Sequence, residues 1–361
     1  MGFEIDFLAV GEESAGGDAI ALRWGNLHGS RSEQTIVVID GGYSDNGSQL
    51  VELIRTHYGT NVVDIVVSTH PDQDHIKGLE TVLEEMEVHQ LLMHQPWKHS
   101  HVVEEARLQN FSTLSFNEKL VRSLQEVSEL EQIATRKGIQ IDEPFAGMQT
   151  NDGCFRVLGP SENFYESLLP EMSSPPSTAQ RLANALRSLG TAVANLVKET
   201  LHEESLTDSG DTRPSNNSSV IALLQVDGKK ILFTGDAGVP ALEHAMDVME
   251  SEGFTPGDFN VVQIPHHGSR RNVGPTILNR MLGDNVHEKA HSVAYVSAPK
   301  KNPEHKHPSK KVTNAFTRRG YAVHATQGRN KRHHHNAPVR EGYSACQPLP
   351  FYDEVEEESA S

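Results

Sequence analysis

Cysteines, aromatic residues and long apolar runs are all scarce in this sequence of 361 residues. The two cysteines, Cys154 and Cys346, form no C-x-x-C pair and no disulfide framework. No apolar run approaches the length that spans a bilayer, and the start, MGFEIDFLAVG, lacks the basic and apolar regions of a signal peptide. These absences predict a cytoplasmic protein of a reducing compartment that makes no membrane contact.

A basic excess is also missing. The chain has 32 Lys and Arg against 49 Asp and Glu, which gives a formal net charge of −17. Phosphate binding normally needs a basic surface, so this charge argues against a general nucleic-acid coat protein. Carboxylates that hold metal ions would count as negative here, although bound cations would offset them. Another acidic cluster lies at 351–361, which we expect to be solvated and disordered.

Strand-like and helix-like segments alternate in the first ninety residues. The runs IDFLAVG, AIALRWG and TIVVIDGG are typical of strands. Residues 48–59 carry apolar residues at helical spacing and end on a glycine suited to a C-cap. A buried strand, VVDIVVSTH, and an amphipathic helix, KGLETVLEEMEV, follow. This order predicts an α/β layered domain.

The middle of the chain changes in composition. Residues 101–140 are mostly helical in pattern, whereas Ser-, Pro- and Asp-rich tracts flank a single helical stretch at 181–201. We interpret residues 161–215 as a helical, partly mobile insertion. Strands return in SVIALLQVDGKKILFTGD, whose Asp-Gly pair is a strong hairpin signal. We therefore predict one domain over 1–340 and an acidic, disordered tail over 341–361.

The stretch STHPDQDHIKG, residues 68–78, concentrates groups that bind metals. It sets His70, Asp72, Asp74 and His75 within six positions at the end of an apolar strand. A short loop there could turn His70 and Asp72 toward one ion, and Asp74 and His75 toward a neighbouring one. The alternative is a polar turn in which Asp74 caps a helix. Four ligand-type residues in so short a stretch favour the metal site.

Three later strand ends carry similar groups. Asp236 follows ILFTG, where a carboxylate could bridge two cations, and His266 and His267 follow VVQIP. After a further strand, His305 and His307 precede a helix. Each of these residues alone has an ordinary structural explanation, such as a turn aspartate or a satisfied core histidine. Together the four strand ends predict a single metal site.

In this order the motifs resemble the metallo-β-lactamase superfamily. The motifs are GEESAGGD, TIVVIDGG, STHPDQDHIKGL, GCFRVLGP, NNSSVIALLQVDGKKILFTGDAG, VVQIPHHGS and HKHP. The similarity covers roughly residues 3–330, apart from the insertion. H-x-D-x-D-H in place of H-x-H-x-D-H, with Asn-Asn-Ser, Thr-Gly-Asp and Pro-His-His-Gly-Ser, is most similar to the competence-protein (ComEC) nuclease-domain branch.

The resemblance implies a fold and a ligand set. The expected fold is an αββα four-layer sandwich with a metal site at one edge. The resemblance implies metal ligands at His70, Asp72, Asp74, His75 and Asp236, with His266, His267 and His307 matching the later histidine motifs. Asp40 would support ligands without reacting itself. Which of His266 and His267 binds metal stays open. We favour His307 over His305, because a proline follows it directly as in the family's last motif.

The chemistry of these ligands indicates the cofactors. Replacing an imidazole by the Asp72 carboxylate makes the site harder and shifts its preference toward manganese or magnesium, although zinc binds more tightly when available. Two divalent ions about 3.5–4 Å apart could share a hydroxide made from water and stabilise both attacking and leaving oxygens of a phosphodiester. Asp74 would also orient the water, and His266 or His267 would protonate the leaving group.

Basic residues flank two of the motif loops. Positive charge near the predicted mouth would suit a phosphate substrate, and we predict substrate contacts from Arg270, Lys300 and Lys301, with Arg271 beside them. The basic stretch 329–336 reads as a solvated loop. Trp97 could stack a base or anchor its loop.

Three functions are compatible with this sequence. The leading hypothesis is a metal-dependent hydrolase of phosphodiester bonds acting as a DNA or RNA nuclease. The acidic excess motivates a second, in which the substrate is a small phosphodiester, a cyclic nucleotide or an ester. The third is a non-catalytic metal-bound sensor or assembly module, which would contact a protein partner through the insertion or the acidic tail.

Overall fold

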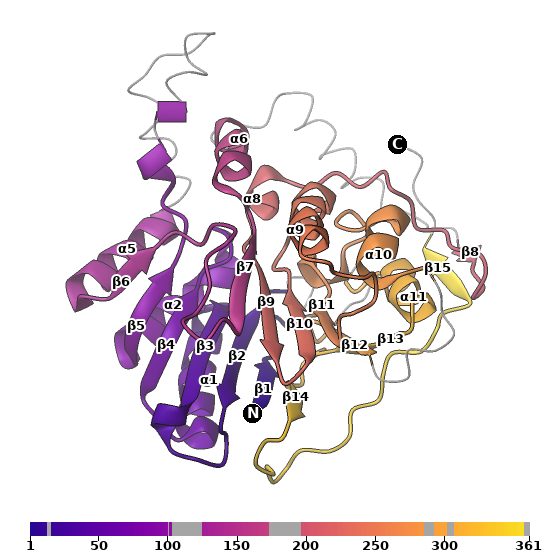
Figure 1. Cartoon of the computed structure of the whole chain (residues 1–361). Helices are drawn as coiled ribbons and strands as arrows, with labels where there is room; N and C mark the ends of the chain where they lie inside the picture. The colour runs from indigo at the N-terminus through magenta and orange to yellow at the C-terminus, as the bar shows by residue number, and fades with distance from the viewer. Residues whose placement is uncertain are drawn as a thin grey trace.

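A computed structural model of the chain describes residues 1–12, 16–99, 101–102, 125–172, 196–284, 292–301 and 307–356. Its main elements are two large β-sheets that lie face to face (Figure 1). The first sheet has the strand order β14 (Lys331–His335), β1 (Gly2–Phe7), β2 (Ala19–Gly25), β3 (Gln34–Gly41), β4 (Val62–Val67), β5 (Glu87–Leu92) and β6 (Gln140–Asp142).

The second sheet is built from the later part of the chain. Its order is β13 (Tyr321–Ala325), β12 (Ser292–Val296), β11 (Val261–Gln263), β10 (Lys229–Phe233), β9 (Ile221–Val226) and β7 (Phe155–Gly159). A separate two-stranded ribbon pairs β15 (Glu354–Glu356) with β8 (Leu196–Lys198). The Asp-Gly turn predicted between β9 and β10 is confirmed, since Asp227 and Gly228 both have positive φ and the two strands pair antiparallel.

Helices cover the outer face of each sheet (Figure 1). The first sheet carries α1 (Ser44–Leu53), α2 (Gln73–Glu85) and α5 (Gln125–Lys137), and the second carries α9 (Val239–Ser251), α10 (Pro275–Leu282) and α11 (Lys310–Arg318). A π-helical turn at Ile54–Tyr58 continues α1, and Gly59 ends it with φ 69°, as its predicted C-cap role requires. Short elements are η1 (Arg31–Glu33), η3 (Pro96–His99), α6 (Glu162–Met172), α8 (Pro214–Asn217) and η4 (His266–Gly268).

The buried apolar side chains form three clusters, which define four layers. On β2, Ile20 and Leu22 point between the sheets, whereas Ala21 points toward the helices, as period-two alternation dictates. One cluster fills the space between the sheets, and each of the other two fills the space between a sheet and its helices. The predicted αββα sandwich is therefore confirmed.

Parallel pairing brings the functional loops to one edge. In the first sheet β3, β4 and β5 are parallel neighbours, and in the second β10, β11, β12 and β13 are parallel neighbours. Neighbouring parallel strands end at the same edge, so the loops that follow them meet there. The segments after β4, β10 and β11 hold most of the predicted site residues, and Asp40 lies at the end of β3.

Residues 351–356, which fall in the tail predicted as disordered over 341–361, pack against the rest of the chain. In β15, Val355 is fully buried. The backbone of Tyr352 exchanges two hydrogen bonds of 2.8 Å with the Asn314 amide. Burial of an apolar side chain and satisfied backbone groups stabilise this segment in spite of its acidic composition.

Two local predictions are also corrected. The helix predicted over 181–201 gives way to strand β8 at Leu196–Lys198, because these residues pair with β15; residues 181–195 lie outside the described part of the chain. Residues 331–335 form β14 on the edge of the first sheet instead of a solvated loop, because their backbone pairs with β1. Every helix within the described ranges is too short or too polar to span a bilayer.

Candidate metal centre

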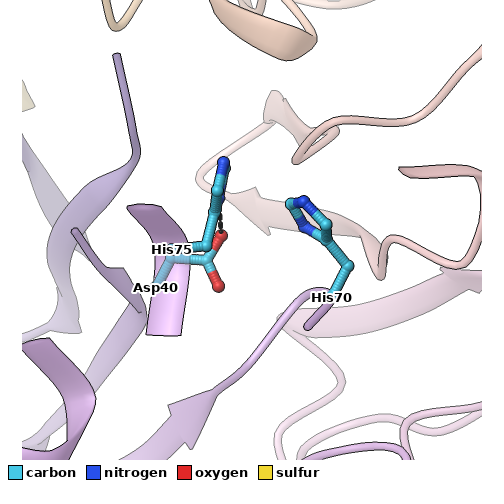
Figure 2. Close-up of side chains that lie close together, drawn as sticks. All are labelled: Asp40, His70 and His75. Carbon is cyan, nitrogen blue, oxygen red and sulfur yellow. Dashed lines mark hydrogen bonds and ion pairs between the residues drawn. The ribbon is translucent and has the colours of Figure 1, made fainter. Parts of the chain in front are cut away.

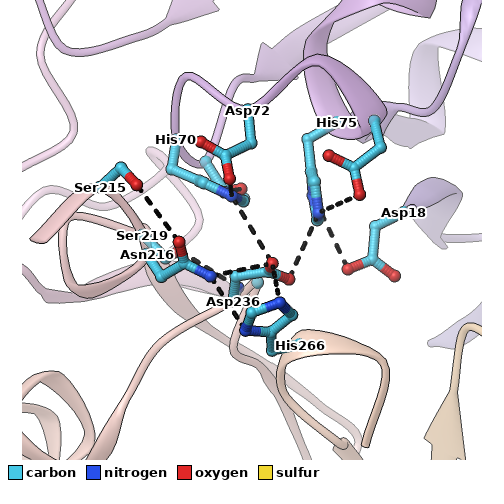
Figure 3. Close-up of polar contacts among 12 residues, drawn as sticks. Asp18, His70, Asp72, His75, Ser215, Asn216, Ser219, Asp236 and His266 are labelled. Atoms are coloured by element: carbon cyan, nitrogen blue, oxygen red, sulfur yellow. Dashed lines mark hydrogen bonds and ion pairs between the residues drawn. The ribbon is translucent and has the colours of Figure 1, made fainter. Parts of the chain in front are cut away.

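The buried carboxylate of Asp236 lies at the middle of the site (Figure 3). It follows β10 directly, after Gly235. Its Oδ1 lies 3.3 Å from His75 Nε2 and 3.9 Å from His267 Nε2. Its Oδ2 lies 3.7 Å from His70 Nε2 and 3.6 Å from His266 Nε2. The two oxygens thus face two different pairs of imidazoles.

The segment that runs from the end of β4 into the first turn of α2 presents four side chains in two pairs. His70 Nε2 lies 3.9 Å from Asp72 Oδ2, and His75 Nε2 lies 3.9 Å from Asp74 Oδ2. Asp72 is the N-cap residue of α2, and Asp74 lies in its first turn, so the capping role considered for Asp74 is wrong. Because α2 begins inside the motif, its first turn directs Asp74 and His75 to the same side.

Asp40 contacts the imidazole of His75 directly (Figure 2) and is linked to that of His70 through Thr69. It has φ 54° at the end of β3, and its Oδ2 lies 2.7 Å from His75 Nδ1. It also accepts hydrogen bonds from the backbone N–H and the hydroxyl of Thr69, and that hydroxyl lies 3.0 Å from His70 Nδ1. A carboxylate that accepts from Nδ1–H leaves Nε2 as the free lone pair, which is the orientation a metal ligand needs.

His266 and His267 lie in the short turn η4 with positive φ values of 48° and 55°. His267 is buried, and its Nε2 lies 3.5 Å from Asp74 Oδ2. His266 is about a third exposed, and its Nδ1 lies 2.9 Å from Asn216 Nδ2 and 3.0 Å from Asn272 Oδ1. The strained backbone therefore directs two adjacent imidazoles to different sides of Asp236.

His307 lies beside this turn. Its ring centroid is 6.1 Å from that of His266 and 6.3 Å from that of His267. The backbone N–H of Ser309 donates to the carbonyl of Gly268, which fixes the His307 loop against η4. His305, the alternative considered, lies outside the described residues.

Two site residues were missed from the sequence. Asp18 is buried, and its Oδ2 lies 3.8 Å from His75 Nδ1. A Cβ on the preceding Gly17 would lie 2.2 Å from the Asp74 carbonyl, so only glycine allows the approach. The Gly-Gly-Asp pattern was the available signal. The second missed residue is Asn216, whose side-chain amide donates a hydrogen bond to Asp236 Oδ2 at 3.3 Å.

Charges in the centre are strongly coupled. Burial opposes ionisation of Asp236, but His75, His266 and His267 outweigh it and hold the pKa of Asp236 well below its usual range. Burial also opposes ionisation of Asp74, yet the adjacent imidazoles of His267 and His75 lower its pKa to about 2. For the imidazoles, burial lowers the pKa and the nearby carboxylates raise it. Asp236 and Asp40 raise the pKa of His75 well above its usual value. Asp236 and Asp74 raise the pKa of His267 to about 9. These carboxylates require positive charge at the centre.

The hydrogen bonding of the centre fits divalent cations. Several buried atoms that can bind a metal have no hydrogen-bond partner among the described residues. They include His70 Nε2, His75 Nε2, His267 Nε2, Asp18 Oδ1 and Asp236 Oδ1. Buried polar atoms in folded proteins almost always have partners. Orphan imidazole nitrogens and carboxylate oxygens aimed at common points are the donors that zinc and manganese take.

The predicted substrate-binding lysines contact residues 11 and 12. Lys300 is exposed, and its Nζ contacts Glu12 at 3.2 Å. The backbone N–H groups of Lys300 and Lys301 donate to the carbonyls of Gly11 and Glu12, in the loop that leads to Asp18. Arg270 is half-buried, three positions after His267. These contacts place the basic residues beside two loops of the site.

Trp97 serves as an anchor. Its Nε1 donates to Glu131 Oε1 at 3.2 Å, and the ring packs against the helix-side core of the first sheet. Of the two roles considered for this residue, these contacts favour the structural one, because both the polar and the apolar parts of the indole are engaged.

Residues 31–131 match the model of the metallo-β-lactamase superfamily. One similar solved structure is a candidate metallo-β-lactamase from Thermotoga maritima, with 11% identity over 65% of this chain and 79% of that chain and a TM-score of 0.34. A diphosphatase of the PhnP family has 10% identity over 92% of this chain and 98% of that chain, with a TM-score of 0.39. The metallo-β-lactamase SMB-1 bound to 2-mercaptoethanesulfonate has 10% identity over 76% of this chain and 91% of that chain, with a TM-score of 0.34. No curated protein matches the chain. The similarity to the metallo-β-lactamase superfamily thus covers residues 31–131, and the four-layer sandwich of the described residues agrees with it.

Proposed function

We propose that this protein is a metal-dependent hydrolase that cleaves phosphodiester bonds and acts as a nuclease. The observation that carries the proposal is the position of the Asp236 carboxylate, whose two oxygens face the unpaired Nε2 atoms of His75 and His70. Within the superfamily, the H-x-D-x-D-H and Pro-His-His-Gly-Ser motifs support the competence-protein nuclease-domain branch. A cytoplasmic location and a protein partner at the insertion or tail are proposed from composition alone.

The ligand sets follow from the distances. Asp74, His75 and His267 would hold one divalent ion together with Asp236 Oδ1, because the Nε2 atoms of His75 and His267 each lie within 3.9 Å of both Asp74 Oδ2 and Asp236 Oδ1. His70 and Asp72 would hold the second with Asp236 Oδ2. His307 stays a proposed further ligand. We propose zinc or manganese, with magnesium also compatible; when bound, such ions act as Lewis acids and make a water more acidic.

The residues around the ions would perform the proton transfers. In the hydrolysis a water oxygen bonds to phosphorus, the ester P–O bond breaks, and the leaving oxygen takes up a proton. Asp74 would orient the attacking water, since its side chain is partly exposed at 26%. His266 is the most accessible imidazole of those around Asp236, with 32% of its side chain exposed, and would pass the proton released by the attacking water to the leaving oxygen.

The second candidate is hydrolysis of a small phosphodiester, a cyclic nucleotide or an ester. The net charge of −17 favours it, because a long polyanion is repelled by an acidic surface. Lys300, Lys301 and Arg270, which we propose as substrate contacts, favour the polymer, because their positive charge would attract it. The two candidates share one centre and differ only in the size of the substrate.

The experiment is metal analysis of the purified protein followed by a substrate panel. The panel contains single-stranded DNA, double-stranded DNA, RNA and bis(p-nitrophenyl) phosphate, each with manganese, zinc or magnesium. We expect about two divalent ions per chain and cleavage of at least one polymer, abolished by chelation and by Asp74→Ala. Asp45→Ala, at an exposed aspartate on α1, is the matched control and should behave as wild type.

Each alternative has its own outcome. Cleavage of the small ester with all polymers intact selects the second candidate. Absence of any turnover by the metal-loaded protein contradicts hydrolysis. If a folded Asp74→Ala variant also behaves as wild type in cells, the metal-bound sensor or assembly module becomes the correct function.

A further inference from the structure

A second group of metal-binding side chains lies outside the centre around Asp236. His99 ends the short helix η3, His101 follows two positions later, and Glu162 and Glu166 lie on α6. The two glutamates are four residues apart on a helix, so they share one face. His99, Glu162 and Glu166 each offer a ligand atom within 4.8 Å of the other two. The fold thus gathers imidazoles and carboxylates from two separate segments of the chain.

The carboxylate of Glu166 is the point where the two imidazoles meet. Its Oε1 lies 2.8 Å from His99 Nδ1 and 3.2 Å from His101 Nε2. Two ligands of a tetrahedral zinc ion are about 3.3 Å apart when each lies about 2.0 Å from the metal. The three atoms therefore have the spacing of neighbouring ligands around one ion.

The other nitrogen of His99 has the environment of a metal-bound imidazole. His99 Nε2 lies 3.2 Å from both oxygens of Glu143, and Glu143 Oε1 accepts a hydrogen bond of 2.8 Å from the backbone N–H of Gln95. Metal-binding histidines usually donate their second N–H to a carboxylate, which fixes the ring. With Nε2–H directed at Glu143, the lone pair of Nδ1 faces Glu166. A lone pair and a carboxylate oxygen repel each other unless a proton or a cation lies between them.

A proton on His99 is the alternative to a metal ion. Burial lowers the pKa of His99, but Glu166 and Glu143 outweigh it and raise the pKa. That proton supplies one positive charge, and no lysine or arginine in the described part of the chain pairs with Glu143, Glu162 or Glu166. A divalent ion supplies twice that charge and also engages His101.

We propose that His99, His101, Glu162 and Glu166 form a structural zinc site, in which Glu143 orients His99. Zinc accepts both imidazole and carboxylate ligands in tetrahedral geometry, and four protein ligands leave no open position for a substrate. The ion would join η3 to α6, because His99 and Glu166 are 67 positions apart. His101 and Glu162 are exposed, so the ion exchanges with solvent and the site fills when zinc is added.

The test measures zinc binding to Asp236→Ala, which lacks the carboxylate that faces both donor sets of the centre. We expect added zinc to bind at a site that Glu166→Gln and His101→Gln, each introduced into Asp236→Ala, weaken by about tenfold or more. Each substitution removes one ligand, and even groups that only orient ligands typically contribute about 10- to 100-fold. Equilibrium dialysis gives the affinity and the number of ions.

The matched controls are Glu171→Gln and His89→Gln. Glu171 is exposed near the end of α6, and His89 on β5 has 56% of its side chain exposed. Both variants should bind zinc as Asp236→Ala itself does. Zinc should also raise the unfolding midpoint of Asp236→Ala and of the controls, but not that of Glu166→Gln, because a ligand that binds only the folded state stabilises it.

Zinc binding at this site requires no hydrolase activity, so this proposal and the proposed function can fail separately. Loss of one bound ion in Glu166→Gln and His101→Gln supports the zinc site, whether or not the wild-type protein cleaves any ester. Equal zinc affinity in these variants and the controls overturns it and assigns a proton to His99. An unfolding midpoint that zinc leaves unchanged in Asp236→Ala overturns the structural role.

Discussion

Two histidine-rich regions of this molecule have opposite environments. The imidazoles around Asp236 lie in loops at strand ends, where His75 is within 3.3 Å of one carboxylate and 2.7 Å of another. His333, His334 and His335 lie within β14, and their backbone pairs with β1. Both regions are conspicuous in the sequence, yet only the first collects carboxylates around several imidazoles.

The surroundings of single rings explain the difference. His333 stacks on Phe3 with a centroid distance of 5.9 Å, and burial together with neighbouring histidines lowers its pKa to about 4. His75 experiences the opposite field, because Asp40 and Asp236 raise its pKa in spite of burial. The comparison teaches that carboxylates and orphan nitrogens indicate a metal centre, whereas a high count of imidazoles does not.

Removing the central carboxylate should give the largest effect. Asp236→Ala takes away the group that faces both donor sets, so we expect loss of bound metal and a fall in activity of at least about 10³-fold. Metal content and kcat/KM on the best substrate of the panel are the measurements. Asp227→Ala, at the other end of the β9–β10 hairpin, removes the partner of His335 and should change neither. If both variants had the same metal content and the same kcat/KM, Asp236 would have no special role in metal binding compared with Asp227.

The next largest effect should come from the support beneath the imidazoles. Asp40→Asn keeps the size of the side chain but weakens its hold on His75 and Thr69. Groups that orient metal ligands typically contribute 10- to 100-fold, and we expect a loss of about that size in metal affinity. Competition with a coloured chelator measures it. Unchanged affinity would show that the His75 ring needs no orientation by this carboxylate.

A pH experiment sharpens the comparison from the side of β14. In the unfolded chain His333 titrates near its ordinary pKa of 6.5, so between about pH 6.5 and 4 the unfolded state binds more protons than the folded state. Folding stability therefore falls as the pH is lowered through this window, by about 2 kcal/mol at pH 5 for this group. His333→Phe should remove that part of the pH dependence, measured by urea unfolding at pH 7 and pH 5. An identical pH slope in both proteins would contradict a buried neutral His333.

The smallest effect is expected at the surface. His335 has 40% of its side chain exposed, and its pair with Asp227 at 2.8 Å is accessible to water. Exposed pairs contribute little, so His335→Gln should leave the unfolding midpoint, metal content and activity at wild-type values. A loss of bound metal in this variant would assign β14 a part in metal binding.

The sequence by itself determined the layered α/β class and the region of the site. The apolar runs of β3, β4 and β10 and the turn signals at Gly59 and Asp227 are local, since they depend on side-chain periodicity and on the φ values that neighbouring residues allow. The density of His and Asp between positions 70 and 75 is equally local. These features were predictable without any knowledge of long-range contacts.

Tertiary structure alone decided which groups meet. Asp18 and Asn216 reach the centre from segments far apart in sequence, and nothing in their local patterns gives a distance to His75 or Asp236. Glu143 and Glu166 meet His99 in the same way, from 44 and 67 positions away in sequence. Val355 was misjudged for the same reason, because its burial against β8 depends on a partner more than 150 positions away. Local composition sets what a residue can do chemically, and packing decides which partner it meets.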